Sequence, residues 1–508
     1  MSEALPGMPP APPPAKPRDA SVALLFRRVA GGVEVFWLRR ETSLSFAGGF
    51  YAFPGGGVDK QDPSIPVEGA EGMDATLRVA AARELLEETG VLVAKGAEKL
   101  SPEQVIGLRR ELVDGKKSFK QILDEHGLAL RKSDFPEAGR WITPPALPRR
   151  FDARMFLVEA PQNAQPERWP GELAEGAWIR PEEGVRRWEE GRALLHPPNL
   201  HALRVMAGFS TVEDARAKLA SPTHCPDFIA ERIEFQQGIR VVPLRTPTLL
   251  PATHTNCYVV GNGELVAVDP GAHDDDEIDR IASYLEGLAA DGLKLRAVFL
   301  THHHGDHVGS ALALRKRLGA ELWFHPITAE HLGITADRLL NEGDVVELAG
   351  SPPMRFDVLH TPGHARGHLC LVHQSSRAAL VGDMVAGVGT ILIDPPDGDM
   401  AEYLRQLRRL RDLPVGALYP AHGPTLPDGP AKLEEYLQHR AMREARILDA
   451  IPAAGATLEE IVEKGYDDVA PFARPVAERS TVAILEKLVR EGAVRQDGER
   501  YLTTAAGR

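Results

Sequence analysis

The spacing of apolar and polar residues divides the 508-residue chain into three blocks. Apolar runs within 21–38 predict two strands joined by a glycine turn, and 73–89 has the composition of a helix. From 238 to 420, apolar runs alternate with helical stretches, which is typical of a layered α/β domain. The last block, 439–508, has helical stretches followed by a predicted hairpin that turns at Asp497-Gly498.

These blocks and the stretches between them predict the domain organisation. A chain of this length is expected to hold about three domains. The first residues are rich in Pro and Ala and indicate a disordered tail, and a stretch with few apolar runs separates the first two blocks. The predicted order is a tail over 1–17, a first domain over 18–212, a linker over 213–234, a second domain over 235–438 and a terminal domain over 439–508.

One loop carries most of the candidate chemistry of the second domain. The apolar run 297–300 precedes Thr301-His302-His303-His304-Gly305-Asp306-His307-Val308-Gly309, so a predicted strand delivers four imidazoles and a carboxylate into one loop. Imidazole nitrogen and carboxylate oxygen are ligand types for zinc. The alternative is a surface cluster or a purification tag, but a tag would stand at a terminus. Four candidate ligands on a single short loop are too many for that loop to wrap around one closed tetrahedral site, which favours two metals: His302, His304, Asp306 and His307.

Three later segments place a further candidate ligand directly after an apolar run. They contribute His364, Asp383 and His422. A lone histidine next to Gly and Pro is more often structural than a ligand. Four separate segments with the same arrangement are difficult to explain in that way, so we expect a shared metal site.

This ordered set of motifs resembles the metallo-β-lactamase superfamily. The resemblance implies an αββα sandwich with two zinc ions, where hydroxide is available at neutral pH and the growing oxyanion is stabilised. It also implies that Asp306 takes part in catalysis, and that Asp269 orients a ligand from behind. The absence of a cysteine ligand disfavours antibiotic hydrolysis. The implied assignment is His302, His304 and His364 at the first metal, Asp306, His307 and His422 at the second, and Asp383 as the bridge, with His303, His360 and His368 near the site and less favoured as ligands.

The first domain has its own candidate site on the predicted helix 73–89. Glu84, Glu87 and Glu88 lie at positions i, i+3 and i+4, so their carboxylates share one helix face. Such carboxylates repel unless a hard cation lies between them, and Mg²⁺ or Mn²⁺ fits oxygen ligands. A solvated acidic face is the alternative. The glycine-rich stretch 47–57 favours the metal site, because glycines allow the backbone to approach a ligand closely.

The sequence Arg83 to Val91, with the glycines before it, resembles the Nudix box. The resemblance implies an α/β/α sandwich that hydrolyses nucleoside diphosphates linked to another group. It implies that Glu84, Glu87 and Glu88 bind metal and that Glu84 or Glu88 is the catalytic base. An insertion at 60–72 looks like the subgroup of peroxisomal coenzyme A diphosphatases, so coenzyme A is suggested by kinship only. Within it, 62–71 is either a substrate gate or a loop, and we favour a loop.

The terminal block predicts a winged helix. Together with the second domain it is similar to the β-lactamase-like protein 2 family, which includes single-stranded RNA endoribonucleases. Its acidic and basic residues are about balanced, and phosphate binding needs clustered positive charge, so a packing or dimer role is favoured over nucleic-acid binding. The basic stripe Arg405, Arg408, Arg409 and Arg411 is interpreted as a solvated helix face.

Composition and charge exclude some classes of protein and indicate the cellular compartment. The net charge of −13 argues against general coating of nucleic acid. No stretch approaches the roughly 20 apolar residues that span a bilayer, and three scattered cysteines predict a cytoplasmic protein without disulfides. The sequence leaves the oligomeric state open.

The sequence therefore predicts a bifunctional hydrolase. The first domain would cleave a diphosphate-linked small molecule, with coenzyme A or its acyl derivatives as candidates. The second would cleave a phosphodiester, with single-stranded RNA as the candidate. The alternatives are thioester hydrolysis, suggested by likeness to glyoxalase II, and a nucleotide-sensing DNA-binding regulator.

Overall fold

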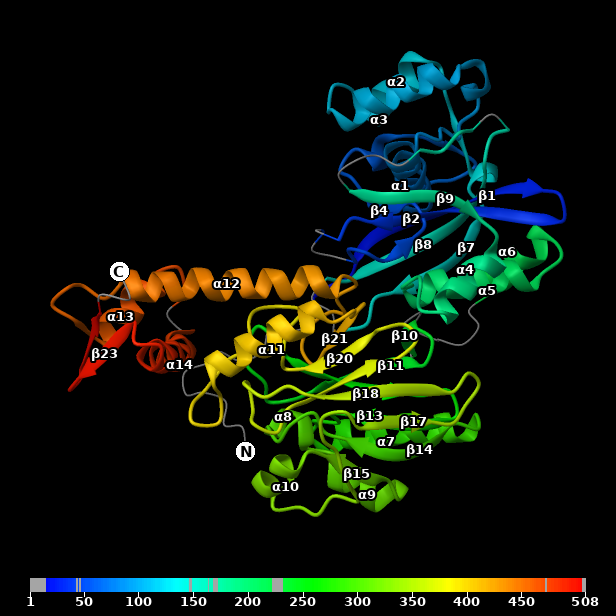
Figure 1. The fold of residues 1–508 in the computed structure, drawn as a ribbon. Helices are drawn as coiled ribbons and strands as arrows, with labels where there is room; N and C mark the ends of the chain where they lie inside the picture. The colour runs from blue at the N-terminus through cyan, green and yellow to red at the C-terminus, as the bar shows by residue number, and fades with distance from the viewer. Residues whose placement is uncertain are drawn as a thin grey trace. The chain divides into compact units, whose positions relative to one another are not determined.

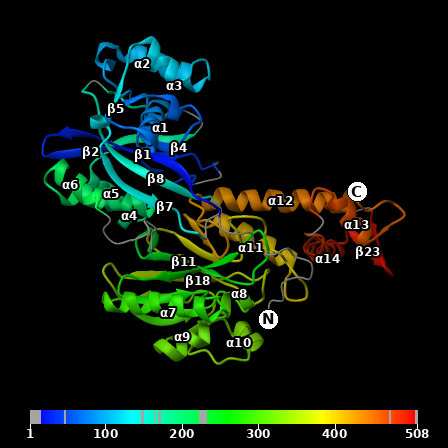
Figure 2. The ribbon, with the colours of Figure 1, turned by 180° about the vertical axis from the view of Figure 1, so that it is seen from behind.

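The computed structural model describes residues 15–42, 44, 47–145, 149–162, 164–167, 172–221, 232–470 and 473–504. The chain divides into two compact units, 13–237 and 238–508 (Figures 1 and 2). Most of the predicted tail and the linker residues 222–231 lie outside the described residues. None of the described helices combines the length and the apolar character needed to cross a membrane.

The N-terminal unit is built on one mixed sheet of seven strands. Its central strands β1 and β8 run parallel, while β2 runs antiparallel to β1. The main path is β3 (Tyr51–Ala52), β2 (Gly32–Arg40), β1 (Arg18–Val29), β8 (Phe151–Glu159) and β7 (Glu137–Ile142), with β4 (Gly55–Gly57) on β1 and β9 (Leu173–Ile179) on β2. A separate short ladder joins β5 (Val67–Glu68) to β6 (Leu130–Arg131).

Helices cover both faces of this sheet. Successive side chains of a strand point to opposite faces. Ala23 and Leu25 of β1 therefore join the core around α1 (Gly72–Thr89), α2 (Pro102–Val113) and α3 (Phe119–Glu125). Leu24 and Phe26 join the core around α4 (Pro181–Glu189), α5 (Pro197–Gly208) and α6 (Val212–Ala220). The unit is an α/β/α sandwich, as predicted.

Helix α6 occupies the first part of the stretch 213–234 that was predicted to be a linker. Its Val212, Ala215 and Leu219 are buried in the core of the N-terminal unit. The stretch therefore begins as a packed helix, and β10 (Ile233–Gln236) ends it where the chain passes between the units. The sparse apolar residues of 212–220 suffice because they are spaced for one helix face.

The C-terminal unit contains two sheets, which extend across the green and yellow part of Figure 1. Tyr258 of β12 and Tyr419 of β21 meet between them, with ring centroids 5.6 Å apart. The first sheet contains β11 (Ile239–Arg245), β12 (His254–Val260), β13 (Glu264–Val268), β14 (Lys294–Phe299), β15 (Glu321–Phe324) and β16 (Arg338–Leu339). The second contains β17 (Val345–Leu348), β18 (Met354–His360), β19 (Leu369–His373), β20 (Ala379–Gly382) and β21 (Leu418–Pro420).

Each sheet carries helices on its outer face. One apolar cluster joins the first sheet to α7 (Asp275–Ala290) and α9 (Ala311–Leu318). A second joins the other sheet to α11 (Met400–Asp412) and α12 (Gly429–Asp449). Two short helices, α8 (Gly305–Val308) and α10 (Pro326–Leu332), lie in the connections. The predicted αββα sandwich is confirmed.

The C-terminal end of the chain forms the predicted winged helix. It contains α13 (Leu458–Gly465), α14 (Arg474–Arg490) and a sheet in the order β22 (Ala456–Thr457), β24 (Arg500–Thr503), β23 (Val494–Asp497). The expected boundary at 438/439 falls inside the continuous helix α12, which runs from the sandwich to α13 and α14 (Figures 1 and 2). One apolar cluster runs through Val381, Leu407, Ile447 and Ile484, so the winged helix and the sandwich share a core.

Candidate functional site

The loop 301–309, which carries the candidate ligands and is called the metal loop here, lies where parallel strands of the first sheet end together. Val268 of β13 pairs with Phe299 of β14, so Asp269 and the following loop emerge at one edge. Asp269 accepts hydrogen bonds from the Thr301 amide at 2.8 Å and the Thr301 hydroxyl at 2.7 Å. It also lies 2.9 Å from Nδ1 of His307. Asp269 therefore orients a candidate ligand, in the role that the sequence predicted for it.

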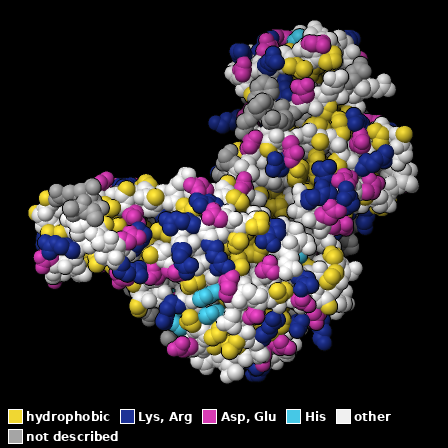
Figure 3. Space-filling model, viewed as in Figure 1, with side chains coloured by type: hydrophobic (Ala, Val, Ile, Leu, Met, Phe, Trp, Pro, Cys, Tyr) yellow, Lys and Arg dark blue, Asp and Glu magenta, His cyan; other side chains and the backbone are white. Residues whose placement is uncertain are grey.

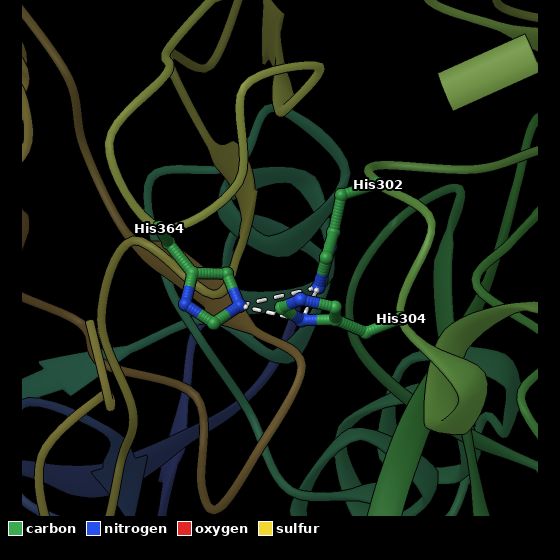
Figure 4. A group of neighbouring side chains, drawn as sticks. All are labelled: His302, His304 and His364. Carbon is green, nitrogen blue, oxygen red and sulfur yellow. Dashed lines mark hydrogen bonds between the residues drawn. The ribbon is translucent and has the colours of Figure 1, made fainter. Parts of the chain in front are cut away.

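Three imidazoles converge at the first site (Figure 4). His302 Nε2 lies 3.0 Å from His304 Nδ1 and 3.3 Å from His364 Nε2, and the last two atoms are 3.0 Å apart. Nitrogens at the usual distance from a tetrahedral zinc would lie roughly 3.3 Å apart. The three nitrogens therefore match one face of a tetrahedral metal site.

Asp383 lies between this site and a second one. Its Oδ2 is 3.5 Å from His364 Nε2. Its Oδ1 is 3.6 Å from His307 Nε2 and 3.4 Å from His422 Nε2. Asp306 Oδ2 completes the second group at 3.4 Å from His422 Nε2. One carboxylate thus presents an oxygen to each group, which is the geometry of a bridging ligand.

Buried polar atoms in this centre fit a cation. His307 Nε2 and Asp383 Oδ1 are buried and have no hydrogen-bond partner among the described residues. Leaving such atoms without a partner is costly. A divalent cation with nitrogen and oxygen ligands would satisfy both atoms, so the donor set fits the dinuclear metal centre implied by the fold.

Hydrogen bonds fix which ring nitrogen each histidine presents. The Thr301 hydroxyl lies 2.9 Å from His302 Nδ1, so Nε2 is left for the metal. Nδ1 of His364 donates to the Leu392 carbonyl at 2.8 Å, and Nδ1 of His422 donates to the His254 carbonyl at 3.1 Å. His368 Nε2 accepts from the Asp383 amide at 3.1 Å. His368 is thus a neighbour that holds the backbone of Asp383.

The electrostatics agree with these roles. Burial and the neighbouring imidazoles hold the pKa of His302 well below its usual range, so this ligand is neutral. Burial raises the pKa of Asp383, but His422 and His307 outweigh it, and the carboxyl stays ionised. Burial lowers the pKa of His307, but three carboxylates led by Asp383 outweigh it and raise the pKa well above normal. A cation that binds there would displace this proton.

The remaining histidines of the loop region lie beside the centre. His303 Nε2 lies 3.6 Å from Asp397 Oδ2, and His360 Nε2 bonds the Arg366 carbonyl. His303, His304 and Asp397 also bring ligand atoms within 4.8 Å of one another. The Arg366 guanidinium, 3.2 Å from Asp397 Oδ1, makes that group a poor cation site. In Figure 3 histidine side chains are visible on the surface of this unit among basic and acidic ones.

The N-terminal unit brings the predicted glutamates to the glycine turn. Glu88 Oε2 accepts from the Gly55 amide at 2.9 Å. A Cβ at Gly56 would lie 2.4 Å from Glu84 Oε1, so only glycine permits this approach. Arg83 Nη1 donates to Glu84 at 2.8 Å and to Glu87 at 3.1 Å. The three carboxylates therefore lie on one helix face against β4, as the sequence predicted.

Burial raises the pKa of Glu87 to about 7 and that of Glu88 to about 8. Keeping these carboxylates together at a raised pKa is unfavourable for stability, which indicates a functional role, and a hard cation between them would offset the repulsion.

Asp62 belongs to the insertion that was predicted as a loop, and residues 62–64 of this insertion form a short 3₁₀ helix. Asp62 is buried and receives Arg83 Nε at 3.1 Å. It is a positioning residue that the sequence did not single out.

Fold and site together define an αββα sandwich that holds a candidate dinuclear His/Asp metal centre. Family models agree: "Metallo-beta-lactamase superfamily" matches residues 250–422, and "Beta-lactamase associated winged helix domain" matches 457–501. The first match contains all seven candidate ligands of this centre.

Curated relatives resemble the C-terminal part of the chain. Lactamase-like protein adaB of Aspergillus niger is 31% identical over 208 residues, 40% of this chain and 61% of the relative. Atrochrysone carboxyl ACP thioesterase of Aspergillus chevalieri is 31% identical over 227 residues, 42% of this chain and 68% of the relative. The β-lactamase-like protein 2 homolog of Caenorhabditis elegans is 26% identical over 245 residues, 47% and 80%. This chain belongs to the metallo-β-lactamase superfamily.

Solved structures resemble each unit. A metallo-β-lactamase family protein from Thermus thermophilus is 24% identical and covers 53% of this chain and 99% of its own, with a TM-score of 0.44. A Nudix hydrolase from Alicyclobacillus acidocaldarius is 28% identical and covers 40% of this chain and 97% of its own, with a TM-score of 0.36.

Proposed function

We propose that the C-terminal unit hydrolyses acyl thioesters, with zinc as the metal, and that the N-terminal unit cleaves a diphosphate bond with Mg²⁺ or Mn²⁺. The observation that supports the first activity is the dinuclear His/Asp centre in a chain 31% identical to a relative named as an acyl-carrier thioesterase. Two cations held there would polarise the thioester carbonyl and make hydroxide available at neutral pH. The carboxylates of Asp383 and Asp306 would offset part of their charge, and His364 and His422 are oriented by backbone carbonyls.

Single-stranded RNA, the first expectation from the sequence, is less favoured. Phosphate binding requires clustered cations that are free to make contacts. In the terminal block 439–508, Arg443 of α12 is paired with Asp468, and Arg490 of α14 is paired with Asp399. In the stripe of α11, Arg409 is paired with Glu342 and Arg411 with Glu434, while Leu404, Leu407 and Leu410 are buried. The same pairing disfavours a DNA-binding regulator.

The thioester proposal is tested with a substrate panel and one variant. Acyl thioesters of coenzyme A and of a carrier protein, and a labelled single-stranded RNA, are incubated with the wild type and with Asp306→Asn. Thiol release that requires Asp306 would support the proposal. RNA cleavage that requires Asp306, without thiol release, would reassign the centre to phosphodiesters. The exposed pair Arg315–Asp337 provides Asp337→Asn as a matched control, which should behave as the wild type.

For the N-terminal unit the supporting observation is the cluster of buried glutamates at the glycine turn. A substrate that contains both a diphosphate and a thioester, such as an acyl-coenzyme A, would suit both units of one chain. Coenzyme A, its acyl forms and other diphosphate-linked nucleosides form the first panel.

Glu88→Gln should lower diphosphate cleavage by about 100-fold or more, which is the usual contribution of a general base. Glutamine keeps the shape and can still accept from the Gly55 amide, so the melting temperature should change little. Release of nucleoside monophosphate is measured by chromatography. Glu68→Gln, at an exposed glutamate paired with Lys95, is the control. Full activity of Glu88→Gln would remove Glu88 from the site.

A further inference from the structure

We propose that Arg440, a buried arginine of α12, is a positioning residue for the dinuclear centre. It lies between the two stretches matched by the family models, 250–422 and 457–501. Its guanidinium donates a hydrogen bond to the Ile391 carbonyl. The next carbonyl, that of Leu392, holds Nδ1 of His364 at 2.8 Å. The buried guanidinium of Arg440 therefore holds the residue directly before Leu392, whose carbonyl orients a candidate ligand of the first site.

The same guanidinium also reaches toward the bridging aspartate. Arg440 Cζ lies 5.4 Å from the ring centroid of Tyr403, within the range of a cation–π contact. The Tyr403 hydroxyl donates to the Met384 carbonyl at 2.7 Å. Met384 directly follows Asp383. Arg440 and Tyr403 thus support the backbone that directly follows Asp383.

Tyr436, one turn before Arg440 on α12, holds the stretch between these two points. Its hydroxyl accepts from the Ala386 amide at 2.8 Å and lies 3.0 Å from the Gly389 carbonyl as a donor. Tyr436 and Arg440 together bind the backbone of residues 384–392 at three places. This stretch begins beside Asp383 and ends at the Leu392 carbonyl, so α12 sets the spacing between two ligands.

Apolar packing completes this support. Ile391 and Ile393 are buried in the cluster that also contains Leu433 of α12 and Ile484 of α14. The pairs Arg479–Asp394 and Arg490–Asp399 also join α14 to this region, but they are about half exposed and contribute little. The C-terminal helices therefore act on the metal centre mainly through Arg440 and the shared core.

Burying the guanidinium of Arg440 costs free energy that an apolar side chain would not cost. Arg440 Nε has no hydrogen-bond partner among the described residues, and an apolar side chain of similar length would pack without that penalty. Replacing buried charges by apolar residues is often neutral for stability. The hydrogen bond from the guanidinium to the Ile391 carbonyl, one residue before Leu392, explains the presence of Arg440 better than stability does, so metal binding is the property that should respond to its removal.

Arg443, one turn later on α12, offers a matched control. It is as deeply buried as Arg440, and its Nε likewise has no partner among the described residues. It donates to the Gly465 carbonyl and to Asp468, within the winged helix and away from residues 384–392. A loss of buried charge affects both variants, whereas a loss of support for His364 affects only Arg440.

The test titrates metal-free, full-length protein with Co²⁺ and follows the visible absorption of the bound ion, with metal counted by mass spectrometry. Arg440→Met should weaken Co²⁺ binding roughly tenfold, the lower end of what loss of an outer ligand support costs. Arg443→Met should bind Co²⁺ as the wild type does. Arg440→Lys, which keeps one donor for Ile391, should recover part of the affinity.

Tyr436→Phe removes one hydroxyl and provides a second variant if Arg440→Met does not fold. It should weaken Co²⁺ binding in the same direction. Unchanged affinity in both Arg440→Met and Tyr436→Phe would overturn the proposal, as would equal weakening in Arg443→Met. The proposal depends on the metal centre and not on the substrate, so the Co²⁺ titration can contradict it whether or not the protein hydrolyses thioesters.

Discussion

Asp383→Asn should lower turnover at the C-terminal centre by about 1,000-fold, since the metals supply several kcal/mol of transition-state stabilisation. The two carboxylate oxygens of Asp383 face different groups, at 3.5 Å from His364 Nε2 and 3.4 Å from His422 Nε2. Asparagine keeps one oxygen and no charge, so it can complete only one site. We expect the metal content to fall from about two ions per chain to about one.

Metal content by mass spectrometry and turnover on the best substrate of the panel check this prediction together. Asp412→Asn, at an exposed aspartate of α11, is the matched control and should change neither quantity. The circular dichroism spectrum separates loss of ligands from loss of fold. If Asp383→Asn kept two metal ions and full turnover, Asp383 could not be the bridge.

The candidate ligands could be predicted because their signal is local. His302, His364, Asp383 and His422 each stand within five residues after an apolar run, and chain segments of that kind end at one edge of a sheet. Residue type and position relative to a strand are both visible in the sequence. The structure brings all of these side chains to one centre, and it brings the glutamates of α1 to the glycine turn.

The supports of those ligands could not be predicted in the same way. The Leu392 and His254 carbonyls orient His364 and His422. Every residue has a backbone carbonyl, so the sequence does not show which of them accepts such a hydrogen bond. Arg440 acts on Ile391 across 49 residues, so no local spacing connects them. Asp62 lies in an insertion whose composition is that of a loop, and only its burial against Arg83 reveals its role.

The domain boundaries show a similar limit. The expected division at 438/439 follows a change in pattern from sandwich to terminal helices, but α12 continues through it. Burial of Leu433, Ile447 and Ile484 in one cluster depends on which helix faces meet, and the sequence of each helix does not specify its partner. A shared core also means that the winged helix and the sandwich should unfold together.

Gly271→Ala should weaken the binding of both metals and lower turnover of the metal-loaded protein by about 100-fold, because even a 1 Å displacement of catalytic groups has an effect of that size. A Cβ at Gly271 would lie 1.7 Å from the Asp306 carbonyl oxygen and 3.0 Å from the His307 amide nitrogen. No rotation of a side chain relieves a clash with backbone, so the turn after Asp269 must move away from the metal loop. This movement separates Asp269 from His307, which are 2.9 Å apart.

The same clash should lower the free energy of unfolding by about 3 kcal/mol, the upper part of the range for overpacked sites. Gly287 of α7 is the matched control, because a Cβ there meets nothing within 4 Å. Gly287→Ala should raise stability by about 0.5–1 kcal/mol, since alanine loses less backbone entropy in a helix. Chemical denaturation of both variants with metal bound, together with their metal content, measures these effects. A Gly271→Ala protein with two metals and wild-type stability would show that the turn after Asp269 does not press on the metal loop, and the ligand geometry built on that contact would then be wrong.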